Sequence, residues 1–302
     1  MVLFMFMKLK AVILPVFLIM AFASSPVAGE VYSYEKDHTV IGSVQNYRVK
    51  KGESLIEIAR HFDLGFNEIA KANSLLDAFV PGTDASVNIP TFWVLPDGES
   101  PGIVINLSEL RLYYSFEQGR SRLVKTYPIG IGDEGTDTPA GTFRIIQKIV
   151  NPSWHVPASI RKERPELPKV VPPGPENPLG SHALRLSIGD VLIHGTNKPF
   201  GVGRRVSHGC IRLYPEDIPK LYQAVPNGTR VTIVRQPVKI GVRDKKIYIE
   251  VHEDESLKEY NYLNETVRIL TRKGLLKDAD MDKVYRAVEE KGGVPVDISL
   301  QK

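Results

Sequence analysis

Cysteine is nearly absent from this chain: one, Cys210, occurs among 302 residues. A single cysteine cannot form an internal disulfide, so its thiol is either free or paired with another molecule. Many lone cysteines are small buried hydrophobic residues without chemistry. Here His194 and His208 lie close to Cys210 in the sequence, and this favours a chemical role for the thiol.

A strong charge of either sign is also missing. The chain has 39 lysine and arginine residues against 35 aspartate and glutamate residues, a formal net charge of +4. It contains no dense basic patch with interleaved aromatic side chains, which proteins that bind nucleic acid usually have. We therefore exclude nucleic acid as a partner, whereas the mild positive charge suits an anionic cell-wall surface. Hydrophobic residues make up 42% and charged residues 25%, so we expect a folded core.

Paired metal-ligand spacings are a third absence. The residues that could in principle bind zinc are His182, His194, His208 and Cys210. None of them forms a short pair such as Cys-x-x-Cys, which zinc sites usually contain. We therefore expect no metal and no other cofactor.

Apolar runs are shorter than the ~20 residues that a membrane-spanning helix needs. Residues 11–22 are apolar, follow Lys8 and Lys10, and lead into the small residues of positions 21–29. This order is typical of a signal peptide, so we predict that residues 1–29 direct export to the periplasm or cell wall and are cleaved. An uncleaved anchor remains the alternative, because residues 1–7 are also apolar. About 270 residues remain after this segment, a length that is typical of two or three domains.

Residues 45–91 have the pattern of a small βααβ module. Extended segments at 47–49 and 86–90 enclose two short helices, and Ser54 can cap the first of them. The apolar face of the first helix follows i, i+3, i+4, i+7 spacing and consists of Leu55, Ile58, Ala59 and Phe62. The second helix presents Phe66, Ile69 and Ala70.

This module resembles a LysM domain, which binds glycans that contain N-acetylglucosamine, such as peptidoglycan. The matching residues are Tyr-Arg-Val at 47–49, Gly-Glu-Ser-Leu at 52–55, Ile-Ala at 58–59, Asn73, and Ile-Pro at 89–90. Val87 departs from the pattern, because leucine is usual there. The resemblance implies that glycan strands of peptidoglycan are a partner, and a plain spacer is the alternative.

The chain after this module turns from a linker into strands. Residues 91–101 carry prolines and Asp-Gly-Glu-Ser, which predicts a linker. Short strands are predicted at 103–107, 110–114, 123–131, 141–146, 182–186, 191–194 and 229–234, with one helix between 215 and 224. We therefore predict a mainly β domain over 101–236. Its proline-rich stretch 151–180 has no periodicity and a length that is usually functional, so we expect it to cover the active site.

Residues 237–302 are predicted to form an accessory α+β extension. A strand at 245–251 precedes two charged amphipathic helices, at about 256–273 and 281–291. No catalytic constellation occurs here. We expect its carboxylates to form a solvated face, with a docking surface for partners as the alternative.

The thiol of Cys210 needs a neighbouring base for chemistry. A cysteine attacks as its thiolate, which is scarce at neutral pH because the free thiol has a pKa of about 8.5. His194 ends the apolar strand 191–193, from which its imidazole can be aimed at a thiol on the next strand. His208 shares one face of an extended backbone with Cys210. Gly209 permits close approach of a substrate, and the N–H groups there can stabilise an oxyanion, so these are the parts of an acyl-transfer enzyme.

The whole pattern resembles a known signature. His-Gly-Thr at 194–196 followed by Ser-His-Gly-Cys-Ile-Arg-Leu at 207–213 is similar to that of YkuD-type L,D-transpeptidases, most of all the ErfK/YbiS-like branch. Supporting matches lie at 127–132, 138–143, 151–154 and 172–178. The resemblance covers about residues 40–238 and implies a YkuD-like β-sandwich with one or two helices.

The resemblance also implies roles for the residues of the signature. Cys210 is the nucleophile, and His194 accepts and donates the proton. The oxyanion is held by N–H groups around His208, Gly209 and Cys210. Ser207 and Arg212 are pocket residues; Arg212 holds a substrate carboxylate, or else forms a structural salt bridge.

Three further residues are assigned from their positions. Trp154, beside the prolines of the 151–180 stretch, is a candidate substrate lid, with ordinary packing as the alternative. We expect His155 to be a loop residue. We expect His182 to contact and support the catalytic pair without taking part in the reaction itself.

The implied reaction is an acyl transfer on peptidoglycan stem peptides. Attack on the carbonyl of the L-centre of meso-diaminopimelate in a tetrapeptide stem releases D-alanine, and an amine then captures the thioester. Another stem peptide gives a 3-3 cross-link, a lysine of an outer-membrane lipoprotein gives wall anchoring, and water gives carboxypeptidase trimming. Two other classes of function remain open: a catalytically silent scaffold that binds peptidoglycan, and a redox-sensing thiol.

Overall fold

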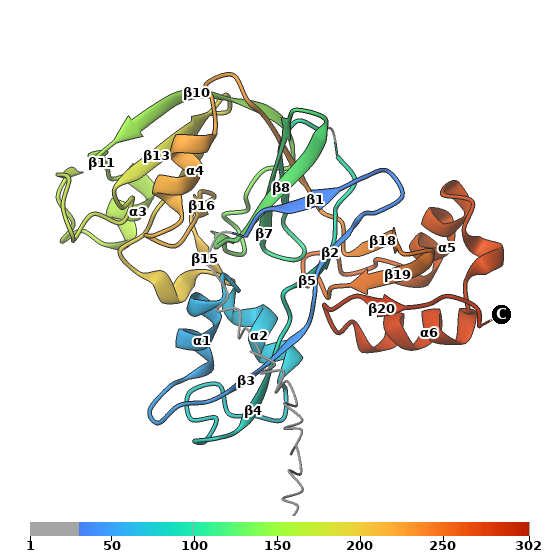
Figure 1. Ribbon diagram of the computed structural model, residues 1–302. Coiled ribbons are helices and arrows are strands. Elements are labelled where there is room, and N and C mark those ends of the chain that lie inside the picture. The colour runs from blue at the N-terminus through green and yellow to red at the C-terminus, as the bar shows by residue number, and fades with distance from the viewer. Residues whose placement is uncertain (1–29, 99, 302) are drawn as a thin grey trace, which may run out of the picture.

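The computed structural model describes residues 30–98 and 100–301. The predicted signal peptide, residues 1–29, lies outside them. Within the described ranges, no helix has the length and apolar character to cross a membrane. Figure 1 shows three parts: a strand-rich domain, a small module with helices α1 and α2, and a C-terminal unit beside them.

The strand-rich domain is built on a nine-stranded sheet with the order β1-β8-β7-β6-β17-β10-β13-β14-β16. Its strands are β1 (Tyr32–Tyr34), β6 (Gly102–Asn106), β7 (Arg111–Gln118), β8 (Ser121–Pro128), β10 (Gly141–Val150), β13 (His182–Leu186), β14 (Leu192–His194), β16 (Ile211–Arg212) and β17 (Arg230–Val234). A short parallel pair, β9 (Ile131–Gly132) with β15 (Arg205–Ser207), lies beside it. The mainly β prediction is therefore confirmed.

The core of this domain is aliphatic and contains the helix α4 (Ile218–Ala224). Ile105, Leu184, Ile193 and Ile211 are fully buried in it. One strand comes from outside the range in which we predicted strands: β1 precedes the small module in sequence and pairs antiparallel with β8. The small module is thus inserted between two strands of one sheet.

The small module has the predicted βααβ order. It consists of β3 (Gln45–Arg48), α1 (Leu55–His61), α2 (Phe66–Ala72) and β4 (Ser86–Ile89). Ser54 caps α1 in a capping box, because its hydroxyl accepts from the Glu57 N–H at 3.3 Å and the Glu57 carboxylate accepts from the Ser54 N–H at 2.9 Å. The predicted apolar face of α1 is buried as expected.

The predicted linker at 91–101 is partly a strand. Residues Phe92–Val94 form β5, which pairs with β2 (Val40–Gly42). Trp93 is 3% exposed within it. The turn signals that predicted a linker lie after residue 94, whereas Phe-Trp-Val before them is apolar and finds a partner strand that is distant in sequence.

The C-terminal unit is α+β, as predicted. Its elements are β18 (Val238–Arg243), β19 (Lys246–Val251), β20 (Val296–Asp297), α5 (Tyr262–Arg272), α6 (Met281–Glu290) and the short 3-10 helix η2 (Leu276–Asp278). The first helix begins six residues later than expected, at Tyr262 instead of 256. Asn261 caps it by accepting from the Asn264 N–H, and this cap sets the start.

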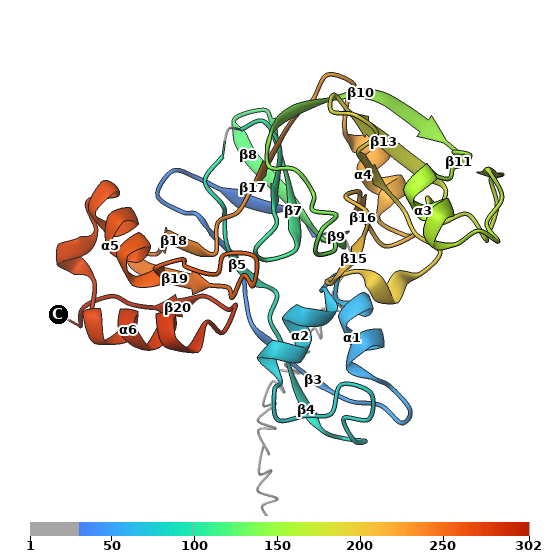
Figure 2. The ribbon, with the colours of Figure 1, turned by 180° about the vertical axis from the view of Figure 1, so that it is seen from behind.

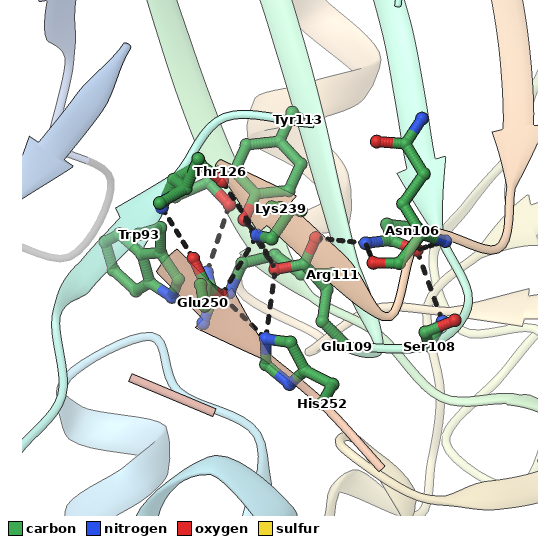
Figure 3. Close-up of polar contacts among 12 residues, drawn as sticks. Trp93, Asn106, Ser108, Glu109, Arg111, Tyr113, Thr126, Lys239, Glu250 and His252 are labelled. Carbon is green, nitrogen blue, oxygen red and sulfur yellow. Dashed lines mark hydrogen bonds and ion pairs between the residues drawn. The ribbon is translucent and has the colours of Figure 1, made fainter. Parts of the chain in front are cut away.

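Buried ion pairs join the C-terminal unit to the strand-rich domain. Lys239 Nζ lies 2.6 Å from Glu109 Oε2 and 3.0 Å from Glu250 Oε1, and all three side chains are at most 1% exposed (Figure 3). Glu250 also accepts from the Val94 N–H at 2.6 Å and lies 2.6 Å from His252 Nε2. Because these charges come from different parts of the chain, the network fixes how the parts sit together.

A second buried pair joins the small module to the same domain. Arg111 on β7 is fully buried, and its Nη2 lies 2.7 Å from Glu68 Oε2 on α2. The guanidinium stacks over the Trp93 ring at 4.3 Å, and the Trp93 Nε1–H donates to Glu68 at 3.1 Å. We call the two clusters together, Glu68–Arg111 and Glu109–Lys239–Glu250, the domain junction.

Candidate active site

The two predicted catalytic residues lie on neighbouring strands. β14 and β16 pair in parallel, with Ile193 opposite Ile211 and His194 opposite Arg212. Both isoleucines point into the core. Alternate residues of a strand face opposite sides, so His194, Arg212 and the Cys210 that precedes β16 lie on the other face. The fold thus brings the thiol and the imidazole together on one sheet surface.

His194 is poised as a base. It is 3% exposed, and its Nδ1 lies 2.5 Å from the Gly195 carbonyl oxygen. A carbonyl only accepts, so Nδ1 carries the proton and Nε2 keeps its lone pair. Burial, with the charge of Arg212 as the second cause, lowers the pKa of His194 to about 4, although the carbonyls of Gly195 and Leu179 oppose this. The imidazole is therefore neutral near pH 7.

Cys210 is a protonated thiol in this resting state. Burial raises the pKa of the Cys210 thiol, while the Leu192 N–H and the charge of Arg212 act against the rise. Its Sγ donates to the Asp190 carbonyl at 3.8 Å, so the thiol is not yet directed at His194. A neutral thiol beside a neutral imidazole is an arrangement for general-base activation during attack.

The turn before Cys210 presents free backbone donors. Ser207 is 2% exposed, and its hydroxyl donates to the Cys210 carbonyl at 2.6 Å, which closes the turn. Gly209 has φ +96°, a conformation that residues with a Cβ rarely adopt. The N–H groups of His208, Gly209 and Cys210 make no hydrogen bond to any residue in the described ranges. Three such donors in a row are suited to an oxyanion.

Arg212 is a cation without a counterion among the described residues. Within residues 30–98 and 100–301, no carboxylate pairs with its guanidinium, and its Nε is buried without a hydrogen-bond partner. Burial lowers the pKa of Arg212, and the nearby Cys210 opposes this. Among the residues that the structure describes, no acid forms the salt bridge that was the alternative role for Arg212. A half-buried guanidinium with no counterion among the described residues fits a carboxylate of a substrate.

Residues 151–180, which we call the lid segment, lie at the same end of the sheet as the thiol. The segment forms a hairpin of β11 (Trp154–His155) and β12 (Val170–Val171), with α3 (Ala158–Glu163) between them. α3 and β11 lie near β13 and β16 in both opposite views (Figures 1 and 2). Trp154 packs in one apolar cluster with Leu179, Leu192 and Cys210. The sequence predicted this stretch as irregular, but it contains a helix and a hairpin.

The other three histidines named from the sequence make contacts of their own. His208 is exposed, and its Nε2 lies 3.6 Å from Glu163 of α3. His155 is exposed on β11 rather than in a loop. The His182 ring packs against that of Tyr222 at 4.7 Å.

The cluster of potential metal donors lies elsewhere, at the domain junction. It consists of Glu109, Glu250 and His252 among the residues that the structure describes. The Lys239 ammonium already supplies the positive charge between its two carboxylates. This cluster is therefore explained as an ion-pair network.

Sequence reasoning missed the groups that hold the catalytic pair. The Asp190 carbonyl accepts from the thiol and the Gly195 carbonyl accepts from the imidazole, while the Leu192 N–H and the Leu179 carbonyl act on the pKa values of Cys210 and His194. All four are backbone atoms, which any residue type supplies, so no sequence signal identifies them.

Comparison with known proteins gives matches over most of the chain. The YkuD model, described as the L,D-transpeptidase catalytic domain, matches residues 100–233, and the LysM domain model matches residues 47–78. The probable L,D-transpeptidase YbiS of Escherichia coli K12 is 37% identical over 306 residues, covering 96% of this chain and 98% of YbiS. The probable L,D-transpeptidase YcfS of the same strain is 39% identical, covering 82% and 81%. The probable L,D-transpeptidase ErfK/SrfK of Salmonella typhimurium is 37% identical, covering 82% and 83%.

Proposed function

Because the chain belongs to the L,D-transpeptidase family, enzymes of the acyltransferase type, we propose that Cys210 carries the acyl group of a peptidoglycan stem peptide as a thioester. Family membership supports cross-linking or attachment on peptidoglycan, and the LysM domain indicates peptidoglycan binding. The observation that carries the proposal is a buried neutral His194 on the strand beside Cys210, next to three free N–H groups.

The first half-reaction releases D-alanine. His194 Nε2 takes the thiol proton as Sγ attacks the carbonyl carbon at the L-centre of meso-diaminopimelate in a tetrapeptide stem. The C=O electron pair moves to oxygen, where the N–H groups of His208, Gly209 and Cys210 stabilise it. On collapse the C–N bond breaks, and the departing D-alanine amine takes the proton from His194. A thioester remains on Cys210.

The second half-reaction transfers the acyl group to an amine. The amine nitrogen attacks the thioester carbonyl and gives its proton to His194, and the C–S bond breaks to regenerate the thiol with that proton. We propose the side-chain amine of a second stem peptide or of a lipoprotein lysine as the acceptor. Water in its place gives a free carboxylate, the carboxypeptidase outcome. Partial exclusion of water by Trp154 and the lid segment favours transfer.

The remaining parts have supporting roles. Arg212 binds a carboxylate of the donor stem, because it is a cation with no counterion in the described protein. The LysM domain holds the glycan strand near the active site, and the joined charges of the domain junction fix their relation. We propose that the enzyme acts at the cell wall after export directed by residues 1–29.

Intact-protein mass spectrometry tests the proposal. The mature enzyme is incubated with a meso-diaminopimelate tetrapeptide stem, and released D-alanine is measured alongside. We expect an adduct on Cys210 with D-alanine release, and neither with Cys210→Ala. The matched control Ser153→Ala, an exposed residue of the lid segment, should retain both.

Two results would contradict the proposal. Peptidoglycan binding without adduct or D-alanine from folded protein would indicate the scaffold function. A stable sulfenate or mixed disulfide on Cys210 with no acyl-enzyme would indicate redox sensing.

A further inference from the structure

Asn177 is a buried polar residue of the lid segment that the catalytic steps do not use. It is 1% exposed, and its side-chain nitrogen lies 2.8 Å from the Pro152 carbonyl, 3.1 Å from that of Pro172 and 3.3 Å from that of Val171. Its Oδ1 accepts from the Leu179 N–H at 2.9 Å. Two amide hydrogens serve three carbonyls, so the longest contact shares a hydrogen.

These contacts join both strands of the lid hairpin at one end. Pro152 lies two residues before Trp154, and Trp154 pairs with Val171 across the hairpin. One side chain therefore holds the two strands together just below the tryptophan. Its position among three carbonyl oxygens requires N–H donors, which explains an amide in place of a carboxylate.

The fourth contact of Asn177, from its Oδ1 to the Leu179 N–H, connects it to the surroundings of His194. Leu179, held by Asn177 Oδ1, packs in the apolar cluster with Trp154 and Cys210, and its carbonyl is one of the backbone groups that act on the pKa of His194. The Leu179 carbonyl also lies 3.5 Å from where a Cβ on Gly195 would be. The same amide thus positions the lid and one of the backbone groups that act on the pKa of His194.

We propose that Asn177 is a positioning residue that keeps the lid closed over the Cys210 thioester and so determines whether an amine or water captures the acyl group. This inference rests on the proposed function. Loosening the hairpin removes Trp154 from the cluster around the thiol and admits water to the thioester. Water then captures a larger share of the thioester, and the amine captures a smaller one.

The test is the product ratio from one acyl-enzyme. Wild-type, Asn177→Ala and Asn177→Asp enzymes receive the tetrapeptide stem with one amine acceptor at fixed concentration, and hydrolysed and transferred products are quantified by mass spectrometry. We expect hydrolysis relative to transfer to rise about tenfold or more in both variants. The ratio does not depend on the fraction of active enzyme, so loss of folded protein alone leaves it unchanged.

A second readout follows the base. If water reaches the site, His194 loses the burial that lowers its pKa to about 4. In Asn177→Ala, the fall of the acylation rate on the acid side of its pH profile should then occur at higher pH. A merely structural role would lower the rate at every pH and leave the pH of that fall unchanged.

Controls separate the possible results. Asn197→Asp breaks one hydrogen bond to the neighbouring Glu176 carbonyl, 3.0 Å long, without touching the hairpin, and should leave the ratio within about twofold. If neither Asn177 variant folds, Trp154→Ala must raise the ratio, because it opens the lid without removing the amide. An unchanged ratio in every variant that forms the adduct would overturn the inference. Absence of the Cys210 adduct from the wild type would instead overturn the proposed function.

Discussion

The domain junction and the active-site face both shield ionisable side chains from solvent, but only the junction pairs them with groups of opposite charge. At the junction, Lys239 lies between two carboxylates and Arg111 contacts Glu68, so every one of these charges has a partner. At the active site, Arg212 has no counterion in the described chain, and burial keeps His194 neutral. Paired buried charge holds the domains together here, whereas the half-buried charge of Arg212 has no partner in the described chain, and we propose that it binds a substrate carboxylate.

The largest effect is expected from removing the base at the active site. His194→Gln offers an amide N–H in place of the Nδ1–H donor but cannot accept the thiol proton, so the rate of Cys210 acylation should fall on the order of 10³-fold. Stopped-flow or quench-flow acylation of the tetrapeptide stem measures it. The exposed His155→Gln serves as the control and should keep the wild-type rate within about twofold.

Removing the Lys239 charge from the domain junction should lower stability. Lys239→Met leaves Glu109 and Glu250 buried without their cation, so the free energy of unfolding at pH 7 should fall by about 3 kcal/mol or more. Urea unfolding measures this. Lys246→Met on the next strand removes an exposed ion pair with Asp297, which solvent screens, and should cost much less stability than Lys239→Met. Equal costs for the two variants would show that burial does not distinguish the pairs.

The neutral state of His194 predicts a pH dependence of stability. Its pKa is about 4 in the folded protein and about 6.5 unfolded, so the unfolded chain binds more protons between these values. Stability is therefore lost as the pH falls from about 6.5 to 4, by about 3 kcal/mol at the end of the window. His194→Gln should lack this loss. Denaturant unfolding of both proteins at pH 7 and 4.5 gives the difference, and parallel curves would contradict a buried neutral imidazole.

The smallest effect on stability is expected at Arg212. Because its guanidinium has no counterion in the described protein, Arg212→Met should change the free energy of unfolding by less than about 1 kcal/mol. The KM of the donor stem should rise by about tenfold or more, through loss of a charge-assisted hydrogen bond to a carboxylate. Thermal unfolding and steady-state kinetics test the two parts. A loss as large as that of Lys239→Met would place Arg212 with the junction residues.

Local patterns predicted the elements that depend on local physics. The capping box at Ser54, the buried face of α1 and the strand that ends at His194 follow from spacing and side-chain type within a few residues. Predictions were wrong where distant segments meet. Phe92–Val94 was expected in a linker and forms β5, because β2, some fifty residues earlier in the chain, supplies its partner.

The residue pattern was enough to predict the chemistry of the site, because a lone cysteine and a nearby histidine in a Ser-His-Gly-Cys setting favour thiol catalysis. The electrostatic state and the surroundings of that pair depend on the folded structure. The parallel register of β14 and β16 sets the face that His194 and Cys210 share, and the burial that follows keeps both neutral. Register and burial depend on contacts between distant segments, and no local pattern encodes those contacts.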